Sequence, residues 1–395
     1  MSPTRYGRPS GREDELRRLE EHLGRAGDGK GGTLLLTGEP GIGKTRLVDA
    51  FCGMAEASGE PGAIVRAFEL LGNYLHQRGL YKDASEMLHK AAAQSEKAGD
   101  ILALARTIAN LGMVVSDSGD LDGSVAHLKR AVALLRRTGS VGPLASTLGN
   151  LGYTYAVMGR NEDALRYQME SLALREKAGR HDATAWCHYD LSIVHENLGN
   201  FAEAEASLRH CLSVWNPLAE PMGYASAETM LASILRNTGR EAEARSLYES
   251  ALEHSKPASL KAMEFSASVG LLRGDRSREA DLMPVLERVS TELDDPKMEM
   301  EVAAVKAECE LAKGDAEGGL AHIARGLELW RGAKKSELDV GAADLLVIKS
   351  QAEEALGRPA DARESLREAV RLYEGRGRRW MAEKVRRHLD EMTSG

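Results

Sequence analysis

The stretch LGYTYAVMGRNEDA, residues 151–164, contains the spacing that decides the fold of this 395-residue chain. Its leucine lies eight residues before its second glycine, and its final alanine lies five residues after that glycine. The same arrangement recurs every 40 residues, with the glycine at Gly79, Gly119, Gly159, Gly199 and Gly239. The leucines are Leu71, Leu111, Leu151, Leu191 and Leu231, and the small residues are Ala84, Ser124, Ala164, Ala204 and Ala244. Amphipathic helices in general do not keep such a register, so the pattern predicts an array of helical hairpins.

Each of these anchor positions has a physical role in a hairpin of two helices. The glycine ends the first helix in a left-handed backbone conformation, the small residue lets the second helix pack closely, and the leucine fills the hairpin core. The residue after the leucine also stays small, as Gly72, Gly112, Gly152, Ser192 and Ala232. Less regular copies surround Gly274, Gly314 and Gly357, with Ala280, Gly319 and Ala362 in the small-residue position. The sequence therefore predicts about eight hairpins.

This pattern resembles the tetratricopeptide repeat over roughly residues 65–375. The period of 40 residues exceeds the ~34 of the standard repeat. It looks like the long-repeat subtype found in kinesin light chains, in mitotic-spindle adaptors and in large LuxR-like bacterial regulators. The resemblance implies an all-α superhelical solenoid of helix hairpins whose concave groove binds a protein or peptide.

The resemblance also implies which residues line that groove. In the kinesin light chains and the spindle adaptors, an Asn just before the core leucine clamps the backbone of a bound peptide, and here Asn110, Asn150 and the variant Asp190 occupy that position. Spacing of three and four residues along the first helices adds Arg106, Tyr153, Trp186, Tyr189, Asn197, Arg236 and Asn237. An amide can both donate to and accept from a peptide backbone. Two alternatives stay open: the amides cross-link neighbouring helices, or Trp186 and Tyr189 fill a gap between repeats.

The segment GEPGIGKT, residues 38–45, matches the phosphate-binding pattern GxxxxGK[ST] between an apolar strand at 33–37 and a helix from about Gly43. Gly38, Gly41 and Gly43 would let backbone amides surround phosphates, Lys44 would bridge the outer phosphates, and Thr45 would offer its hydroxyl to magnesium. Together with GREDELRRL, residues 11–19, it looks like the start of the ATPase domain of LuxR-type and STAND-class signalling proteins.

The rest of such an ATPase is missing from the sequence pattern. No strand ending in Asp and no sensor residue follows Thr45. GAIVRA, residues 62–67, could be a stub of a second strand, but Pro61 and Gly62 interrupt the chain there. The sequence thus predicts a truncated ATPase-like segment (1–62), a repeat array (63–375) and a capping helix (376–395), with no catalytic residues and no required cofactor. The alternative is a switch that binds ATP and magnesium at this loop, with self-association through the N-terminal segment completing the site.

Composition and charge exclude several other classes of function. The net charge of −8 disfavours nucleic-acid binding, and the four scattered cysteines show neither disulfide nor metal spacing. No apolar stretch approaches the ~18 residues of a membrane helix, so we expect a cytoplasmic protein. The basic C-terminal helix is expected to cap the last repeat with Trp380, Val385 and Leu389. The sequence predicts a non-enzymatic regulatory or adaptor module derived from a LuxR-like bacterial transcription regulator; a shortened gene product without a task is a further interpretation.

Overall fold

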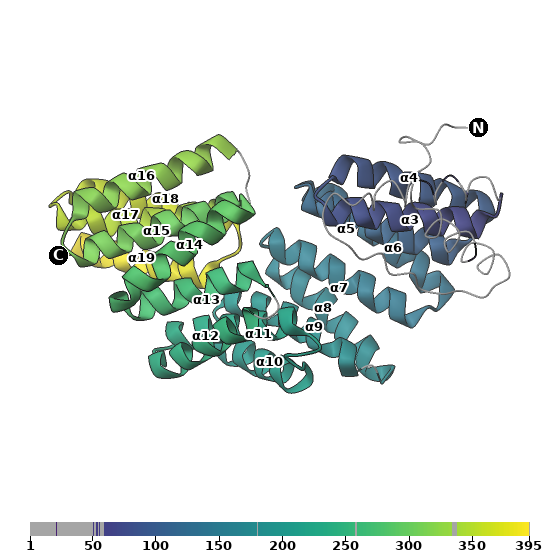
Figure 1. Ribbon diagram of the computed structural model, residues 1–395, viewed down its shortest axis with the longest axis horizontal. Coiled ribbons are helices and arrows are strands. Elements are labelled where there is room, and N and C mark those ends of the chain that lie inside the picture. The colour runs from purple at the N-terminus through teal and green to yellow at the C-terminus, as the bar shows by residue number, and fades with distance from the viewer. Residues whose placement is uncertain are drawn as a thin grey trace. The chain divides into compact units, whose positions relative to one another are not determined.

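A computed structural model of the chain describes residues 59–179, 181–256, 259–333 and 338–394, together with Glu21, Ala50, Gly53 and Ala55. Within these residues the chain forms consecutive α-helices and no strand (Figure 1). The predicted all-α class is therefore confirmed. None of the described helices is long and apolar enough to cross a membrane.

The helices pair in chain order into eight hairpins within the described residues. The first four hairpins are α3 (Pro61–Gln77) with α4 (Tyr81–Ala98), α5 (Ile101–Asp117) with α6 (Leu121–Thr138), α7 (Val141–Val157) with α8 (Asn161–Lys177), and α9 (His181–Leu198) with α10 (Phe201–Val214). The last four are α11 (Pro221–Asn237) with α12 (Glu241–Ser255), α13 (Lys261–Gly274) with α14 (Glu279–Leu293), α15 (Pro296–Ala312) with α16 (Ala316–Ala333), and α17 (Asp339–Ala355) with α18 (Pro359–Gly375). A 3-10 turn, η1 (Arg276–Arg278), precedes α14, and α19 (Arg379–Ser394) follows the eighth hairpin.

The five regular hairpins, α3 to α12, place the anchor residues as predicted. Their turn glycines have φ angles between 70° and 97°, in the left-handed region. The five small residues are at most 1% exposed, and the five leucines at most 6%. A Cβ atom built on Gly112 would lie only 2.8 Å from Cγ of Leu128 in the second helix of the same hairpin. The small residue after the leucine is thus required by close helix packing.

A second series of left-handed residues separates one hairpin from the next. Gly59, Gly99, Gly139 and Gly179 have φ angles of 67° to 70° and follow the same 40-residue period. Two periods after Gly179 the position is occupied by Ser259, whose φ is 54°. A side chain strains this conformation, which glycine adopts freely. Left-handed residues therefore follow many second helices of the array as well as first helices, but α10 and α13 are exceptions that leave the helix through the extended residues Trp215 and Asp275.

The sixth hairpin departs from the predicted pattern. Gly274 is the last residue of α13 and is not among the glycines with positive φ, because the chain leaves the helix through Asp275 in an extended conformation, with φ of −148°. The Asp275 side chain accepts a hydrogen bond from the backbone N–H of Ser277 at 3.2 Å and so begins η1. Ala280 is exposed. The predicted anchor roles of Gly274 and Ala280 are wrong, since a capped 3-10 turn replaces the glycine turn.

The stretch GAIVRA is also corrected by the structure, because it lies inside helix α3. Pro61 occupies the first turn of that helix, where its missing N–H costs nothing. Ile64 and Phe68, four residues apart, are both buried in the first hairpin. Pro61 therefore starts a helix and does not interrupt a strand.

The chain divides into two compact units, Met1–Thr154 and Tyr155–Gly395, which we call unit 1 and unit 2. In unit 1, Phe68, Leu71 and Leu88 belong to one buried cluster that continues into α5. Unit 2 contains two clusters, one extending from α9 to α15 and the other from α15 to α19. Each cluster is built from neighbouring hairpins, as expected for a repeat array.

Helix α19 connects the last hairpin of unit 2 with hairpins far earlier in the sequence. Val385 and Leu389 pack against α17 and α18 as predicted. Trp380, however, packs edge-on against Phe201 of α10, with ring centroids 4.9 Å apart. Two residues before α19 in the sequence, the carbonyl of Gly377 accepts a hydrogen bond from Nδ2 of Asn161 in α8 at 2.7 Å. The prediction that Trp380 covers the last repeat is therefore wrong, because α19 turns this side chain toward the fourth hairpin.

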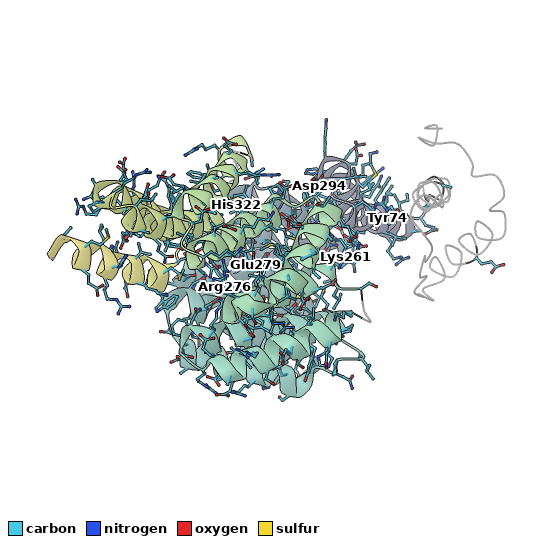
Figure 2. All side chains as sticks on the ribbon, turned by 60° about the vertical axis from the view of Figure 1, so that its left-hand side comes forward. Tyr74, Lys261, Arg276, Glu279, Asp294 and His322 are labelled. Carbon is cyan, nitrogen blue, oxygen red and sulfur yellow. The ribbon has the colours of Figure 1, made fainter. Side chains whose placement is uncertain are left out.

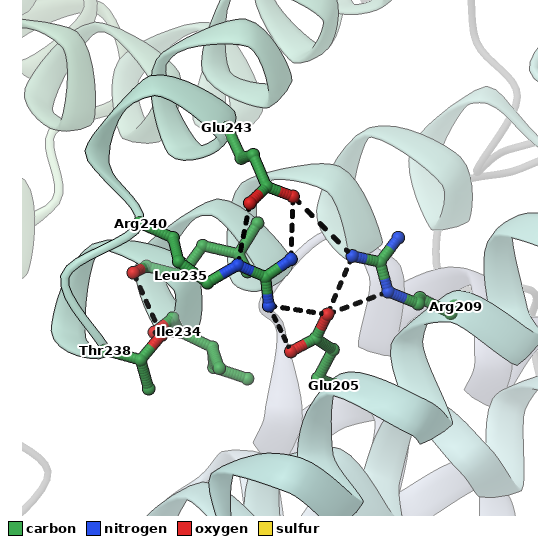
Figure 3. Close-up of polar contacts among 7 residues, drawn as sticks. All are labelled: Glu205, Arg209, Ile234, Leu235, Thr238, Arg240 and Glu243. Carbon is green, nitrogen blue, oxygen red and sulfur yellow. Dashed lines mark hydrogen bonds and ion pairs between the residues drawn. The ribbon is translucent and has the colours of Figure 1, made fainter.

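Exposed ion pairs link neighbouring hairpins at their turns (Figure 3). Arg240, directly after the turn glycine of the fifth hairpin, binds Glu243 of α12 at 2.6 Å and Glu205 of α10 at 2.8 Å. Arg209 binds the same Glu205 at 2.7 Å. Solvent-exposed pairs of this kind add little to stability. The buried anchor residues, not these charges, hold the hairpins together.

Candidate functional site

Unit 2 contains a cavity of about 830 Å³, which we call the charged cavity. Most of its lining comes from the first helices of successive hairpins, namely α9, α11, α13, α15 and α17. The rest comes from Arg276 of η1 and from the segment between Tyr373 and Lys384. Pockets of roughly 300–1,000 Å³ accommodate small ligands or several peptide residues. The cavity is thus large enough to be a binding site.

Helix periodicity explains how the first helices supply both the hairpin core and the cavity. On α11, Ser233, Arg236 and Asn237 are separated by three and four residues and line the charged cavity. Leu231 and Leu235 lie on the opposite stripe and are fully or almost fully buried. Residues three or four apart share one helix face. The core leucines therefore fix the direction in which the three polar side chains point.

A network of ion pairs crosses the charged cavity from α13 to α15. Arg273 contacts Glu301 at 2.7 Å and Glu308 at 3.0 Å. Arg276, labelled in Figure 2, extends from η1 and contacts the second oxygen of Glu308 at 2.8 Å. Burial opposes the ionisation of Glu308, but the two guanidinium groups outweigh it and lower the pKa of this carboxyl. Burial likewise disfavours the charged form of Arg273, yet Glu301 and Glu308 raise its pKa. Glu308 and Arg273 are therefore both charged near neutral pH.

A carboxyl and a phenol form a second polar pair in the charged cavity. The hydroxyl of Tyr373 in α18 donates a hydrogen bond to Asp344 in α17. Burial, with a contribution from Glu301, raises the pKa of Asp344 to about 6. Burial and the neighbouring Asp344 raise the pKa of Tyr373 as well. The pair can hold an additional proton at mildly acidic pH.

Other cationic groups of the charged cavity are less fully neutralised. Arg378 lies 3.6 Å from Glu196, beyond hydrogen-bond distance. The guanidinium of Arg236 lies over the ring of Tyr248, 5.9 Å from its centroid, and its Nη1 atom is buried with no hydrogen-bond partner among the described residues. Lys384 lies over the ring of Trp380 at 5.2 Å. All three residues line the charged cavity.

A second cavity of about 580 Å³ adjoins the first, and we call it the apolar cavity. Its lining includes Met230, Tyr248, Met263, Phe265 and Val269 from α11, α12 and α13. Five residues line both cavities, namely Glu196, Ser233, Arg236, Arg273 and Arg378. The two cavities are therefore neighbouring parts of one larger site.

The structure brings four of the predicted groove residues into these cavities. Asn197, Arg236 and Asn237 line the charged cavity, and Tyr189 and Arg236 line the apolar cavity. Asn197 also donates to Oδ1 of Asn161 at 3.2 Å, so it supports the residue that binds Gly377. Its amide therefore connects helices as well as lining the cavity.

Two other predicted groove residues of unit 2 lie outside both cavities. Trp186 is 39% exposed, and its ring centroid lies 4.7 Å from that of Trp215. The carboxylate of Asp190 accepts a hydrogen bond from Gln168 at 2.9 Å, and burial raises its pKa to about 7. Both side chains contact neighbouring helices or loops of the array.

The predicted groove residues of unit 1 lie on its first helices. Arg106 is held by a bidentate ion pair with the buried Glu69, with distances of 3.2 and 2.9 Å. Asn110 and Asn150 are half-buried, and Tyr153 is 37% exposed. Peptide binding by these residues stays a prediction. The predicted nucleotide-binding residues, Gly38, Gly41, Gly43, Lys44 and Thr45, lie outside the described residues.

Several cavity residues were missed by reasoning from sequence, although their register could have identified them. Ser233, Glu308 and Gln351 each lie six residues before a turn glycine, and all three line the charged cavity. Glu196, which was also missed, lies three residues before such a glycine and lines the cavity too, as the predicted Arg236 does. The number of residues between a position and the following turn glycine therefore indicates which side chains face the cavity, even in hairpins that lack the leucine pattern. Arg378 and Lys384 carry no such signal, because they follow the last hairpin.

Comparisons with known proteins identify two kinds of segment. Residues 143–216 match the family model described as tetratricopeptide repeat, and residues 8–150 match the model described as AAA ATPase domain. The chain thus contains a tetratricopeptide-repeat segment and an N-terminal segment similar to an ATPase domain. The ATPase match extends past the predicted boundary at residue 62 and covers helices α3 to α6 and part of α7. No curated protein matches the sequence.

Solved structures similar to this chain include regulators built from the same kind of repeat. The apo form of the quorum sensor NprR from B. thuringiensis has a TM-score of 0.61 at 12% identity, and the match covers 91% of this chain and 99% of that one. The Rap conjugation gene regulator of the plasmid pLS20, in complex with the Phr* peptide, has a TM-score of 0.59 at 16% identity, covering 82% and 93%. A Rap protein complexed with competence and sporulation factor has a TM-score of 0.59 at 14% identity, covering 96% and 97%. At these identities the likeness establishes the fold.

Proposed function

We propose that this protein is a regulatory module that binds a peptide or protein segment in the cavities of unit 2. The observation that carries the proposal is the charged cavity itself, which the first helices of successive hairpins line with polar side chains. Helical repeat proteins use such inner faces for binding. The peptide complexes of the similar Rap structures support the same use of the fold.

An array of short peptides of random sequence, probed with the full chain, tests this proposal. We expect a subset of peptides to be retained, and a double variant with Asn237→Ala and Gln351→Ala in the charged cavity to retain them less well. The double variant with Asn200→Ala and Gln94→Ala removes the same two amide types from positions on α4 and before α10 that lie outside both cavities, and it should bind as the unchanged chain does. Retention of no peptide by the unchanged chain would reject the proposal.

Whether unit 1 takes part in binding is a separate question. The predicted clamp residues Asn110 and Asn150 lie on its first helices. Replacing both by Ala should weaken binding of the selected peptides if unit 1 contributes to the groove. Unchanged binding would restrict the site to unit 2.

The match to the AAA ATPase model over residues 8–150 favours a second candidate function, a nucleotide-dependent switch. In this proposal Lys44 and Thr45 bind ATP and magnesium, and nucleotide controls partner binding, as in a protein derived from a LuxR-like regulator. Titration of the full chain with ATP, compared with Lys44→Ala, tests it. Negligible binding by both proteins would exclude the switch and leave the peptide-binding proposal untouched.

A further inference from the structure

The two cavities of unit 2 adjoin but differ in chemistry. Arg, Lys, Glu and Asp side chains line the charged cavity, whereas Met230, Met263 and Phe265 are prominent in the apolar cavity. Arg236 lines both. Arg236 is thus one of the residues at which a ligand that extends from one cavity into the other can be contacted.

Cationic groups outnumber acidic groups in the lining of the charged cavity. Five are cationic, namely Arg236, Arg273, Arg276, Arg378 and Lys384, and three are acidic, namely Glu196, Glu308 and Asp344. The chain as a whole has the opposite balance, with a net charge of −8. Because burial raises the pKa of Asp344 to about 6, its negative charge is also the most easily lost. The cavity thus favours an anionic ligand although the protein is acidic.

The cationic groups differ in how far the protein already neutralises them. Arg273 and Arg276 are bound to Glu301 and Glu308. Arg236 and Lys384 instead lie over aromatic rings, and in the part of the chain that the structure describes neither has a carboxylate within ion-pair distance. Nη1 of Arg236 is buried without a hydrogen-bond partner there. Buried donors are normally paired, and a carboxylate is the acceptor that suits a guanidinium group best.

We propose that the two cavities together bind a peptide segment in which an acidic side chain neighbours a bulky apolar side chain. The carboxylate contacts Arg236 and Lys384, and the apolar side chain packs between Met230, Met263 and Phe265. A small free anion would use only the charged cavity, whereas a peptide contacts both. This inference rests on the proposed peptide-binding function and names the class of its ligand.

The array of random peptides also tests this inference, together with two variants of equal charge. The cavity variant carries Arg236→Gln and Lys384→Gln. The control variant carries Arg367→Gln and Lys256→Gln, which removes one Arg and one Lys from exposed positions outside both cavities.

Retained peptides should be enriched in Asp or Glu beside Leu, Ile, Met or Phe. The cavity variant should bind synthetic copies of these peptides about tenfold more weakly or worse, because charge-assisted hydrogen bonds are lost. The control variant should bind them as the unchanged chain does.

Additional measurements separate a lost contact from a lost fold. The variant Arg236→Lys keeps the charge and should retain more binding than Arg236→Gln, while thermal unfolding confirms that each variant is folded. Binding of the acidic peptides should also weaken as NaCl increases.

Four outcomes would overturn the inference. Selected peptides without an acidic preference, or acidic peptides that both double variants bind equally, would overturn it and leave the proposed function in place. Sodium glutamate binding as tightly as the selected peptides would overturn the requirement for a second, apolar contact. If the unchanged chain retains no peptide at all, the proposed function fails as well.

Discussion

The fifth and sixth hairpins are consecutive in the sequence, but they follow different rules. In the fifth, α11–α12, the turn glycine Gly239 has a φ of 82° and the small residue Ala244 is 1% exposed. In the sixth, α13–α14, Gly274 belongs to the helix and Ala280 is exposed. The sixth hairpin instead contributes Arg273 to the charged network of the cavity. The comparison teaches that a polar group can reach the cavity from a regular hairpin, as Arg236 does, and equally from one that lacks the glycine turn, as Arg273 does.

Buried polar groups are paired in both parts of the array. In the regular part, Glu69 is 7% exposed and binds Arg106, and Glu228 is 3% exposed and contacts His254 at 2.9 Å. In the later part, the first helices bring Glu308 and Asp344 to the charged cavity, and α18 brings Tyr373. Stability in both parts therefore depends on close packing and on the pairing of buried polar groups.

The largest expected effect comes from breaking the charged network of the later hairpins. Arg273→Met keeps most of the aliphatic stem but leaves Glu301 and Glu308 without this partner. Removal of one member of a buried pair typically costs about 3–5 kcal/mol of unfolding free energy. Urea unfolding measures the change. Arg276→Met, which removes a more exposed partner of Glu308, should cost less.

The unfolding free energy that Arg273→Met loses should depend on pH in a defined direction. In the unchanged chain the pKa of Glu308 is lowered, so its contribution is present at neutral pH and is lost as the pH falls through its folded value. In Arg273→Met only Arg276 would still oppose the effect of burial on Glu308, so the pKa of Glu308 would rise and its ionisation would stabilise the folded state less. The stability gap between the two proteins should widen from about pH 4 to about pH 7. A gap that narrows over this range would contradict the assigned network.

The second prediction concerns Asp344, whose pKa burial raises to about 6. A raised carboxyl pKa favours the folded state below the unfolded pKa, and this advantage is lost as pH rises through the folded value. Asp344→Asn cannot ionise but can still accept a hydrogen bond from Tyr373. Relative to the unchanged chain, this variant should gain on the order of 2 kcal/mol between about pH 4 and pH 8. Thermal or urea unfolding at several pH values measures this, and a pH-independent difference would contradict it.

A third prediction tests close packing in the regular hairpins. Gly112→Ala places a Cβ atom 2.8 Å from Cγ of the fully buried Leu128. Overpacking costs about 1–3 kcal/mol, which the better helix propensity of alanine offsets by up to about 1 kcal/mol. We expect a net loss in urea unfolding. Gly142→Ala, on α7 with nothing within 4 Å of the new Cβ, should instead be stabilising.

The smallest expected effect concerns the residues between hairpins. Ser259 has a left-handed φ of 54° at a position where the regular part uses glycine. Ser259→Gly should stabilise the chain by up to about 1 kcal/mol, because glycine adopts this conformation without steric cost. The reverse change, Gly99→Ser, should destabilise the regular part by a similar amount, since its φ is 69° and the site is otherwise open. Thermal unfolding measures both, and changes of the same sign would contradict the assignment.

The sequence was sufficient to predict the hairpin array because its anchor residues act locally. A turn glycine, a buried leucine and a small contact residue need only the two helices of their own hairpin, so they repeat visibly. Asn197, Arg236 and Asn237 were also identified before the cavity was known, because helix spacing determines the inner face. Their role as peptide ligands stays a prediction.

The remaining part of the site could not be predicted in this way, because it depends on contacts between distant segments. Lys384 reaches the charged cavity only because α19 returns to α8 and α10. Nothing near Trp380 in the sequence indicates that its partner is Phe201. The position of the turn in the sixth hairpin is hard to predict for a local reason. Asp275 can cap the following turn through its side chain, and this competes with the tendency of the adjacent Gly274 to form a glycine turn.

The hydrogen bond between Asn161 and Gly377 joins residues 216 positions apart, and it changes how unit 2 can come apart. A linear repeat array frays from either end, because each terminal hairpin contacts only one neighbour. In unit 2 the terminal helix is fastened to earlier hairpins through Gly377 and Trp380, so it cannot detach without disturbing them. The entropy lost in closing so long a loop grows only slowly with its length. We therefore expect unit 2 to unfold in one cooperative transition, in which α19 does not detach before the earlier hairpins unfold.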